Sequence, residues 1–401
     1  MLRNPLIAIL TLFGATACDD GTVPNLLGAD TYFVKLNTNA AAVASTTQAI
    51  AGTFGLEVIH TYDAVTEGFS AKLPALLISE VESFNAVEYV RIDEGDHGVP
   101  DEEDPLDDPI EDPSVVIGDD EIPESLLRIG APFTGAGLDQ IHVAVIDTGI
   151  DRNHPDLNVV GEIDLVPLSG SGAAAPGADP NGHGTHCAGT IAAIADGEGV
   201  VGVAPGVALH AVRVLNEDGS GFWTDIVAGL EYVLDHPEIR VVNMSLGGPA
   251  SNDPNDPMRQ AIQRLQDNGV VVVIAAGNED QNTNNVSPAN FDLGVVVSAY
   301  DAAGGSDNGF ASFSNFGPQV DIAAPGVDIM STFPGNRYVE LSGTSMATPA
   351  VAGAIAAYLA SNPDATPADI RDRLIATGED GYAGQGGDHP EPLVDVGALL
   401  E

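Results

Sequence analysis

The sequence contains very little positive charge. Its 401 residues include 13 lysines and arginines against 59 aspartates and glutamates, and the only lysines are Lys35 and Lys72. Nucleic acids and anionic membrane surfaces are bound through positive charge, so this composition argues against both as partners. A strongly acidic surface is instead typical of a secreted protein or of a high-salt habitat, where self-repulsion is screened.

Cysteine is almost absent. Cys18 and Cys187 are the two cysteines, and two cannot build a disulfide framework. Cys18 ends the stretch MLRNPLIAILTLFGATAC, in which Arg3 precedes a short apolar run, as in an export signal over residues 1–17. Ala15-Thr16-Ala17 is a small-x-small cleavage site. A cysteine after it also resembles a bacterial lipoprotein box, so two outcomes stay open: ordinary secretory cleavage, or lipidation of Cys18 that anchors the precursor to the cell envelope.

The remaining chain divides at an acidic, proline-rich segment. Residues 99–124 hold twelve acids, five prolines and no base, so we expect residues 98–124 to form an extended, protease-accessible linker. Before it, residues 30–97 show the order strand, helix, strand, strand, helix, strand, which predicts a small α+β (βαββαβ, ferredoxin-like) domain. After it, residues 125–401 form a second and larger unit.

The larger unit alternates buried strands with helices. Val- and Ile-rich runs such as IHVAVID, IRVVNMSL and GVVVVIAAG are separated by helical stretches. This pattern predicts an α/β fold with three layers (α/β/α), in which helices cover both faces of a parallel sheet. In such sheets functional residues gather at the carboxyl ends of the strands.

Four polar residues occupy such positions or helix starts. Asp147 ends VAVID, and Asn278 follows VVVVIAAG. His183 begins a helix with glycine on both sides, an arrangement that costs stability unless something must approach closely. Ser345 begins the helix SMATPAVAGAIAAYLA, and a serine needs a nearby base and a group that orients this base before it is a good nucleophile. Each signal is weak alone, but the order Asp, His, Ser with spacings of 36 and 162 residues is a strong one.

With the motifs VIDTGID, HPDL, GHGTHCAG, VAP, SLGG, AAGN and GTSMATP, residues 125–401 resemble the subtilisin-like serine proteases. HCAG and DGSG lean toward the proteinase K branch, and residues 30–97 look like the inhibitor-type propeptide of the same family. The resemblance implies a secreted, monomeric endopeptidase that acts on proteins and peptides and is inhibited by its own propeptide. Asp147, His183 and Ser345 would form the triad, and Asn278 would stabilise the oxyanion.

The same resemblance implies where a substrate peptide binds. Two segments would hold the peptide as an added strand, namely Gly219, Ser220 and Gly221, and Ser245, Leu246 and Gly247. Ala275, Ala276 and Gly277 would wall the specificity pocket without any charge, which implies broad, apolar-leaning cleavage.

Calcium is the one cofactor that the resemblance implies. In a first site the carboxylates of Asp156 and Asp196 would be joined by the carbonyls of Ile194, Glu198 and Val200, which gives the all-oxygen shell that calcium prefers. In a second site Asp321 would be joined by carbonyls near Asp292 and Gly294.

Three other interpretations are weaker. His183 and His186 stand three residues apart, but no glutamate lies between them and no third zinc ligand is apparent, so His186 is expected to be a packed neighbour. Cys187 lies in a run of small residues and is expected to be an inert core thiol. An inactive, surface-anchored peptide-binding protein with the same fold is the alternative function, and the four intact active-site residues argue against it.

Overall fold

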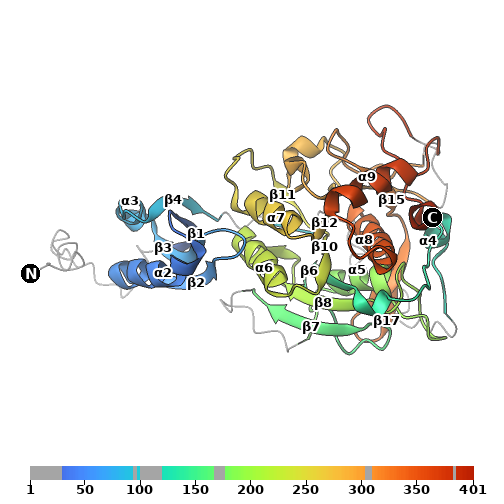
Figure 1. The fold of residues 1–401 in the computed structure, drawn as a ribbon, viewed down its shortest axis with the longest axis horizontal. Helices are drawn as coiled ribbons and strands as arrows, with labels where there is room; N and C mark the ends of the chain where they lie inside the picture. Colours follow the sequence, from blue (N-terminus) through green and yellow to red (C-terminus); the bar gives the residue numbers. More distant parts are fainter. Residues whose placement is uncertain (1–28, 94–96, 100–119, 167–176, 303–308, 383–384) are drawn as a thin grey trace, which may run out of the picture.

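The computed structural model describes residues 29–93, 97–99, 120–166, 177–302, 309–382 and 385–401 (Figure 1). The expected export signal, Cys18 and residues 100–119 of the expected linker lie outside the described residues. Within the described ranges no helix has both the length and the apolar character needed to cross a membrane.

The N-terminal unit has the expected order of elements. They are β1 (Ala29–Leu36), α2 (Ala40–Phe54), β2 (Glu57–Tyr62), β3 (Gly68–Pro74), α3 (Ile78–Glu82) and β4 (Val87–Ile92). The four strands form one antiparallel sheet in the order β2-β3-β1-β4. Successive side chains of β1 point to opposite faces of this sheet. Val34 and Leu36 pack in the core with residues of α2, whereas Phe33 belongs to the core cluster of the larger unit.

The larger unit is built on a seven-stranded sheet whose paired strands are all parallel. The strands are β6 (His142–Asp147), β7 (Val159–Asp164), β8 (Ala208–Arg213), β10 (Ile239–Met244), β12 (Val271–Ala275), β14 (Val295–Tyr300) and β15 (Ile322–Pro325). Their spatial order is β15-β14-β12-β10-β6-β8-β7. The strands after β6 lie on both sides of it, so a topological switch point falls between β6 and β10. Ligand-binding crevices form at such points.

Helices cover both faces of this sheet, which confirms the expected α/β fold. One face packs against α5 (His183–Ala192) and α8 (Thr344–Ser361), and the other against α6 (Trp223–Asp235) and α7 (Pro257–Asp267). The larger unit also contains α4 (Glu124–Arg128), α9 (Pro367–Thr377), α10 (Val396–Leu400) and the hairpin of β16 (Ile329–Phe333) and β17 (Arg337–Leu341). The N-terminal unit lies beside α6 and α7 (Figure 1).

Two pieces of the expected linker are bound to the larger unit, which corrects the expectation of an unpacked chain from 98 to 124. Glu121 donates its N–H to the carbonyl of Gly199 and accepts from the N–H of Val201, and Asp120 accepts from the N–H of Gly197. At the other end, β5 (His97–Gly98) pairs with β9 (Ser220–Gly221). Both pieces bind because backbone N–H and C=O groups of the larger unit, around Gly199 and at β9, form hydrogen bonds with them.

Candidate active site

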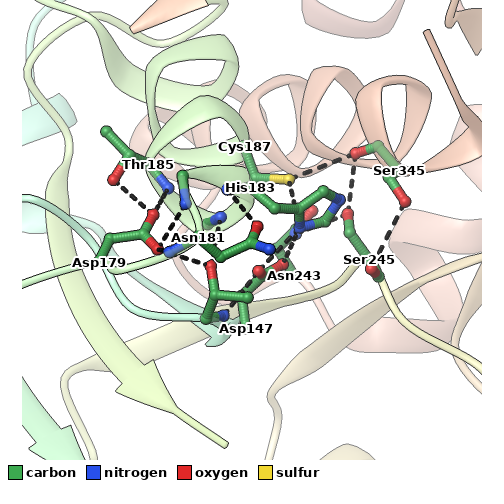
Figure 2. Close-up of polar contacts among 12 residues, drawn as sticks. Asp147, Asp179, Asn181, His183, Thr185, Cys187, Asn243, Ser245 and Ser345 are labelled. Atoms are coloured by element: carbon green, nitrogen blue, oxygen red, sulfur yellow. Dashed lines mark hydrogen bonds and ion pairs between the residues drawn. The ribbon is translucent and has the colours of Figure 1, made fainter. Parts of the chain in front are cut away.

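Asp147 and His183 form the centre of the candidate site (Figure 2). Asp147 is the last residue of β6 and His183 the first residue of α5. Nδ1 of His183 lies 2.8 and 2.9 Å from the two carboxylate oxygens of Asp147, and both side chains are buried. A carboxylate on one ring nitrogen fixes the orientation and the tautomer of the imidazole and directs the other nitrogen away.

The glycines beside His183 are required by close contacts, as the sequence suggested. Gly182 has φ 110°, and a Cβ there would lie 2.3 Å from the ring of Phe333. A Cβ on Gly184 would lie 2.1 Å from the carbonyl oxygen of Gly149. Larger residues would therefore push α5 away from Asp147.

Asp179 holds the start of α5 in place, and the sequence interpretation missed it. One carboxylate oxygen accepts from the hydroxyl of Thr148 at 2.8 Å and from the N–H of Gly182 at 2.8 Å. The other accepts from the N–H and the hydroxyl of Thr185 at 2.8 and 2.7 Å. Burial raises the pKa of this carboxyl group. The available signal was an aspartate four residues before His183, where it can cap a helix.

Ser345 lies in the first turn of α8, a helix in which most residues are buried. Pro349 follows four residues later and has no N–H, so the carbonyl of Ser345 has no partner within the helix. This carbonyl accepts instead from the hydroxyl of Ser245 at 2.9 Å and from Sγ of Cys187 at 3.4 Å. The hydroxyl of Ser345 lies 3.5 Å from the carbonyl oxygen of Ser245. The imidazole of His183 lies between Asp147 and Ser345 (Figure 2).

Asn278 follows β12 and is tied to the same helix. Its side-chain oxygen accepts from the N–H of Thr344 at 2.9 Å and from the hydroxyl of Thr344 at 2.8 Å. Because the oxygen is used, the amide presents its NH₂ group on the other side. This NH₂ group and the N–H of Ser345 at the start of α8 are donors of the kind that stabilises an oxyanion.

His186 and Cys187 are both packed in the core. Nε2 of His186 lies 2.9 Å from the carbonyl oxygen of Ile329, and burial together with the nearby His183 lowers its pKa to about 3. Cys187 is free and fully buried, and burial raises the pKa of its thiol. Neither residue has the properties of a nucleophile at neutral pH.

The two expected substrate-binding segments already hold a piece of this chain. Gly98 exchanges backbone hydrogen bonds with Gly247 at 3.0 and 2.9 Å, and Val99 donates its N–H to the carbonyl of Gly219 at 3.0 Å. Gly221 pairs with His97. Residues 97–99 thus run as a strand between the two segments, as a peptide substrate would.

The backbone of the two segments makes this contact, while their side chains differ in role. The side chain of Ser220 is exposed, and that of Leu246 is fully buried in the core. The hydroxyl of Ser245 supports Ser345, as described above.

The expected pocket wall has a charged neighbour. Ala275 and Ala276 are buried at the end of β12, and Gly277 has φ 101°. A Cβ on Gly277 would lie 2.8 Å from a carboxylate oxygen of Glu279. Glu279 is exposed and lies two residues after the wall, and the side-chain amide of Asn315 donates to the same carboxylate oxygen.

The first expected calcium site fits a cation. Asp156 is buried, and its oxygens accept from the N–H groups of Ile194 at 2.9 Å and Val200 at 3.1 Å. Burial raises the pKa of this carboxyl to about 6, and the nearby charge of Asp196 adds to the shift. A buried carboxylate whose partners are neutral donors, with a second acid close by, leaves negative charge that a divalent cation would balance. Glu198, in the same loop, is exposed.

The second expected calcium site does not fit an ion in this arrangement. The guanidinium of Arg371 lies 2.7 Å from Asp321 and 3.2 Å from Asp292. The other carboxylate oxygen of Asp321 accepts from the N–H of Val296 at 3.0 Å. Gly294 has φ 75° and belongs to the turn before β14. The arginine already supplies the positive charge that the ion would bring.

Comparisons with known proteins agree with this geometry. Residues 139–391 match the model of the Subtilase family. The chain is 42% identical over 289 residues to subtilisin of Bacillus pumilus, and the aligned region covers 70% of this chain and 99% of that protein. It is 41% identical over 289 residues to subtilisin E of Bacillus subtilis (strain 168), and the aligned region covers 70% of this chain and 71% of that protein. These relatives are subtilisins, and they do not confirm the leaning toward the proteinase K branch.

A solved structure covers nearly the whole chain. The crystal structure of fervidolysin from Fervidobacterium pennivorans, described as a keratinolytic enzyme related to subtilisin, aligns with a TM-score of 0.75 and 28% identity. The match covers 96% of this chain and 62% of that chain. The aligned part of this chain therefore extends beyond the residues that match the family model.

Proposed function

The chain belongs to the subtilase family of serine endopeptidases, and from this premise we propose that it is a secreted protease with broad, apolar-leaning specificity, made as a self-inhibited precursor. The observation that carries the proposal is the placement of residues 97–99 as a strand in the cleft, hydrogen-bonded to Gly219 and Gly247. An inhibitor that occupies the substrate position must leave before a substrate can bind.

Peptide-bond cleavage follows from the three central residues. Ser345 attacks the carbonyl carbon of the peptide while His183 accepts the hydroxyl proton as general base. The C–N bond breaks and His183 returns the proton to the leaving amine, which leaves an acyl group on Ser345. Water then attacks this ester with the same proton transfers. Asp147, 2.8 Å from Nδ1 of His183, stabilises the imidazolium that forms in each step.

The oxyanion of each tetrahedral intermediate needs donors that are already in place. Asn278 is oriented by Thr344, which binds its side-chain oxygen and leaves its NH₂ group on the other side, and the N–H of Ser345 is at the positive end of α8. One such donor contributes roughly 3 to 4 kcal/mol to transition-state stabilisation.

Self-inhibition is supported by how the N-terminal unit docks. Glu231 of α6 accepts from three consecutive backbone N–H groups of residues 63–65, at 2.7, 2.6 and 2.8 Å. Asp93 accepts from the N–H and the hydroxyl of Thr224 in the first turn of α6, at 3.0 and 2.6 Å. These bonds hold the unit against α6, the helix that follows Gly219–Gly221, to which residues 97–99 bind.

The wall of the pocket supports the specificity. Ala275, Ala276 and Gly277 leave room for apolar side chains, while the carboxylate of Glu279 near Gly277 can also accept a basic one. Apolar-leaning but broad cleavage is the expected result.

Calcium would serve as a structural ion at the first site. Asp156 and Asp196 would supply carboxylates, and the carbonyls of Ile194, Glu198 and Val200 the remaining oxygens. The ion would stabilise the loop that follows α5, and no step of peptide cleavage depends on it.

A fluorophosphonate probe tests the enzymatic part of the proposal. The mature protein should be labelled at Ser345, and Ser345→Ala should not be labelled. Asn278→Ala should keep the fold and lower turnover by about 10² to 10³. A folded mature protein that binds peptides but is neither labelled nor active on casein would favour the inactive peptide-binding alternative.

The maturation rate tests self-inhibition separately. Glu231→Ala removes the acceptor for three N–H groups of the N-terminal unit and should release active enzyme earlier from the full chain. Asp235→Ala changes an exposed acid at the end of the same helix and is the matched control. If both variants mature at the wild-type rate and are equally inhibited before maturation, the contact of Glu231 with residues 63–65 does not control activity.

A further inference from the structure

Two histidines and a glutamate meet at the end of the sheet opposite to the catalytic residues. His142 begins β6, His210 lies in β8, and Glu238 lies in the turn between α6 and β10. One ligand nitrogen from each imidazole and one carboxylate oxygen all lie within 4.8 Å of one another. Since β6 rises about 3.3 Å per residue, this cluster is roughly 16 Å from Asp147 at the other end of the strand.

The two imidazoles are already close to the separation that a shared metal ion needs. Nδ1 of His142 lies 2.9 Å from Nε2 of His210. Two nitrogens bound to one tetrahedral Zn²⁺ ion are separated by about 3.3 Å, since each Zn–N bond is about 2.0 to 2.1 Å. A small widening of this pair would admit the ion.

His210 has the support that metal-binding histidines have. Its other nitrogen, Nδ1, lies 3.1 Å from the hydroxyl of Tyr232. When Nδ1–H donates to this oxygen, Nε2 keeps a lone pair that faces His142. Tyr232 is itself held against the ring of His236, with centroids 3.9 Å apart. A Cβ on Gly161 would lie 2.4 Å from Nδ1 of His210, so the glycine leaves the room that the pair requires.

The charge state also suits a metal ion. His210 is buried, and burial favours the neutral imidazole that binds a metal ion. His142 is partly exposed and Glu238 exposed, which leaves a path for an ion from solvent. His142 can bind through Nδ1 once its ring proton lies on Nε2.

We propose that His142, His210 and Glu238 form a Zn²⁺ site with an open fourth position for water. Two imidazoles and one carboxylate are the ligands that zinc takes, and calcium and magnesium prefer all-oxygen sites. The ion would join β6, β8 and the turn after α6. Since Glu231 and Thr224 of α6 hold the N-terminal unit, the site would stabilise the helix on which that unit docks.

Zinc binding is best measured on the full chain carrying Ser345→Ala, which cannot digest itself. Equilibrium dialysis with ZnCl₂ in excess CaCl₂, which saturates the acidic surface, should show one tight site. His142→Gln and Glu238→Gln should each weaken zinc binding at that site by at least about tenfold. Tyr232→Phe should weaken it by at most about 100-fold, because it removes only the supporting hydrogen bond to His210. Zinc should raise the melting temperature of the parent but not of His142→Gln.

The controls separate this site from other zinc binding. His389→Gln removes a histidine that lies 3.2 Å from another glutamate, Glu391, and should leave binding unchanged. Asp147, His183 and Cys187 also place ligand atoms within 4.8 Å, so His183→Gln tests the catalytic site as a competitor. Tight binding that survives His142→Gln and Glu238→Gln, or that disappears in His183→Gln alone, would overturn the proposal. Since Glu238 is exposed, its variant stays informative if His142→Gln fails to fold.

Discussion

Pro349 stands four residues after Ser345 in α8 and thereby frees the carbonyl of Ser345 from the helix. That carbonyl is bound by the hydroxyl of Ser245, 2.9 Å away, and by Sγ of Cys187, 3.4 Å away. The helix that presents the nucleophile is therefore connected to the substrate-binding segment and to the helix of His183. A proline that looks unfavourable inside a helix has a structural reason here.

A double-mutant cycle tests this relationship. Ser245→Ala removes one donor to a buried carbonyl and should lower the free energy of unfolding by about 1 to 3 kcal/mol. In the Pro349→Ala background an N–H is available to the same carbonyl, so the effect of Ser245→Ala should be smaller. Chemical denaturation of the four proteins, all carrying Ser345→Ala, gives the coupling energy. If the two substitutions change the free energy of unfolding additively, the hydroxyl of Ser245 and the new N–H at residue 349 do not replace one another as donors to this carbonyl.

The sequence predicted the parts of the site that lie at strand ends and helix starts. Their places at strand ends and helix starts singled out Asp147, His183, Asn278 and Ser345, and the resemblance carried by the surrounding motifs implied their roles. Asp179 was missed because a capping carboxylate in a polar loop looks like any surface acid. Arg371 was missed because its contact with Asp321 joins residues 50 apart, and pairing at that distance depends on the tertiary fold.

Asp179→Asn should impair both stability and turnover. One carboxylate oxygen of Asp179 would become an NH₂ group, which cannot accept a hydrogen bond. It would face either the N–H and hydroxyl of Thr185, or the hydroxyl of Thr148 and the N–H of Gly182. Leaving such buried donors without an acceptor costs about 1 to 3 kcal/mol. We expect a lower melting temperature and a kcat reduced by more than tenfold, because α5 positions His183. Asp139→Asn, an exposed change, is the control, and a normal kcat in Asp179→Asn would contradict this role.

His186 should make stability depend on pH. Its pKa in the folded state is about 3, against the ordinary value of 6.5, because it is buried. Below pH 6.5 the unfolded chain binds a proton that the folded state rejects, so this contribution is complete above pH 6.5 and is lost as the pH falls. The slope is about 1.4 kcal/mol per pH unit. Between about pH 4 and 6.5 the slope measured for Ser345→Ala should exceed that of Ser345→Ala with His186→Gln by about this amount, because the other buried groups titrate in both proteins. His389→Gln should retain the full slope, and equal slopes in all three proteins would rule out His186 as the source.

Chelation should separate the two expected calcium sites. In protein prepared without zinc and loaded with calcium, excess EDTA should lower the melting temperature, because an ion bound only by the folded state stabilises it by mass action. Asp156→Asn should remove most of that sensitivity. Asp292→Asn should keep it, because Asp292 is paired with Arg371. Sensitivity that disappears in Asp292→Asn and persists in Asp156→Asn would reverse the assignment.

The order of segments predicts how the enzyme would leave the cell envelope. If Cys18 is lipidated, the anchor lies on the N-terminal side of the linker and the triad on the other side. Gly98 and Val99 are hydrogen-bonded to Gly247 and Gly219, and Glu121 is bound to the loop at Gly199. Cleavage should therefore fall between residues 99 and 120. The released product would then contain no lysine, since Lys35 and Lys72 both precede the linker.

Fractionation of cells that express wild type and Ser345→Ala tests this order. Wild type should give a soluble product that a lysine-specific protease cannot cut even after denaturation. Ser345→Ala should stay full length and bound to the membrane, because self-cleavage requires the nucleophile. Cys18→Ser in the same background should release the uncut precursor and is the control for the lipid. A soluble, full-length Ser345→Ala protein would show that Cys18 carries no lipid and that Ala15-Thr16-Ala17 is an ordinary secretory cleavage site.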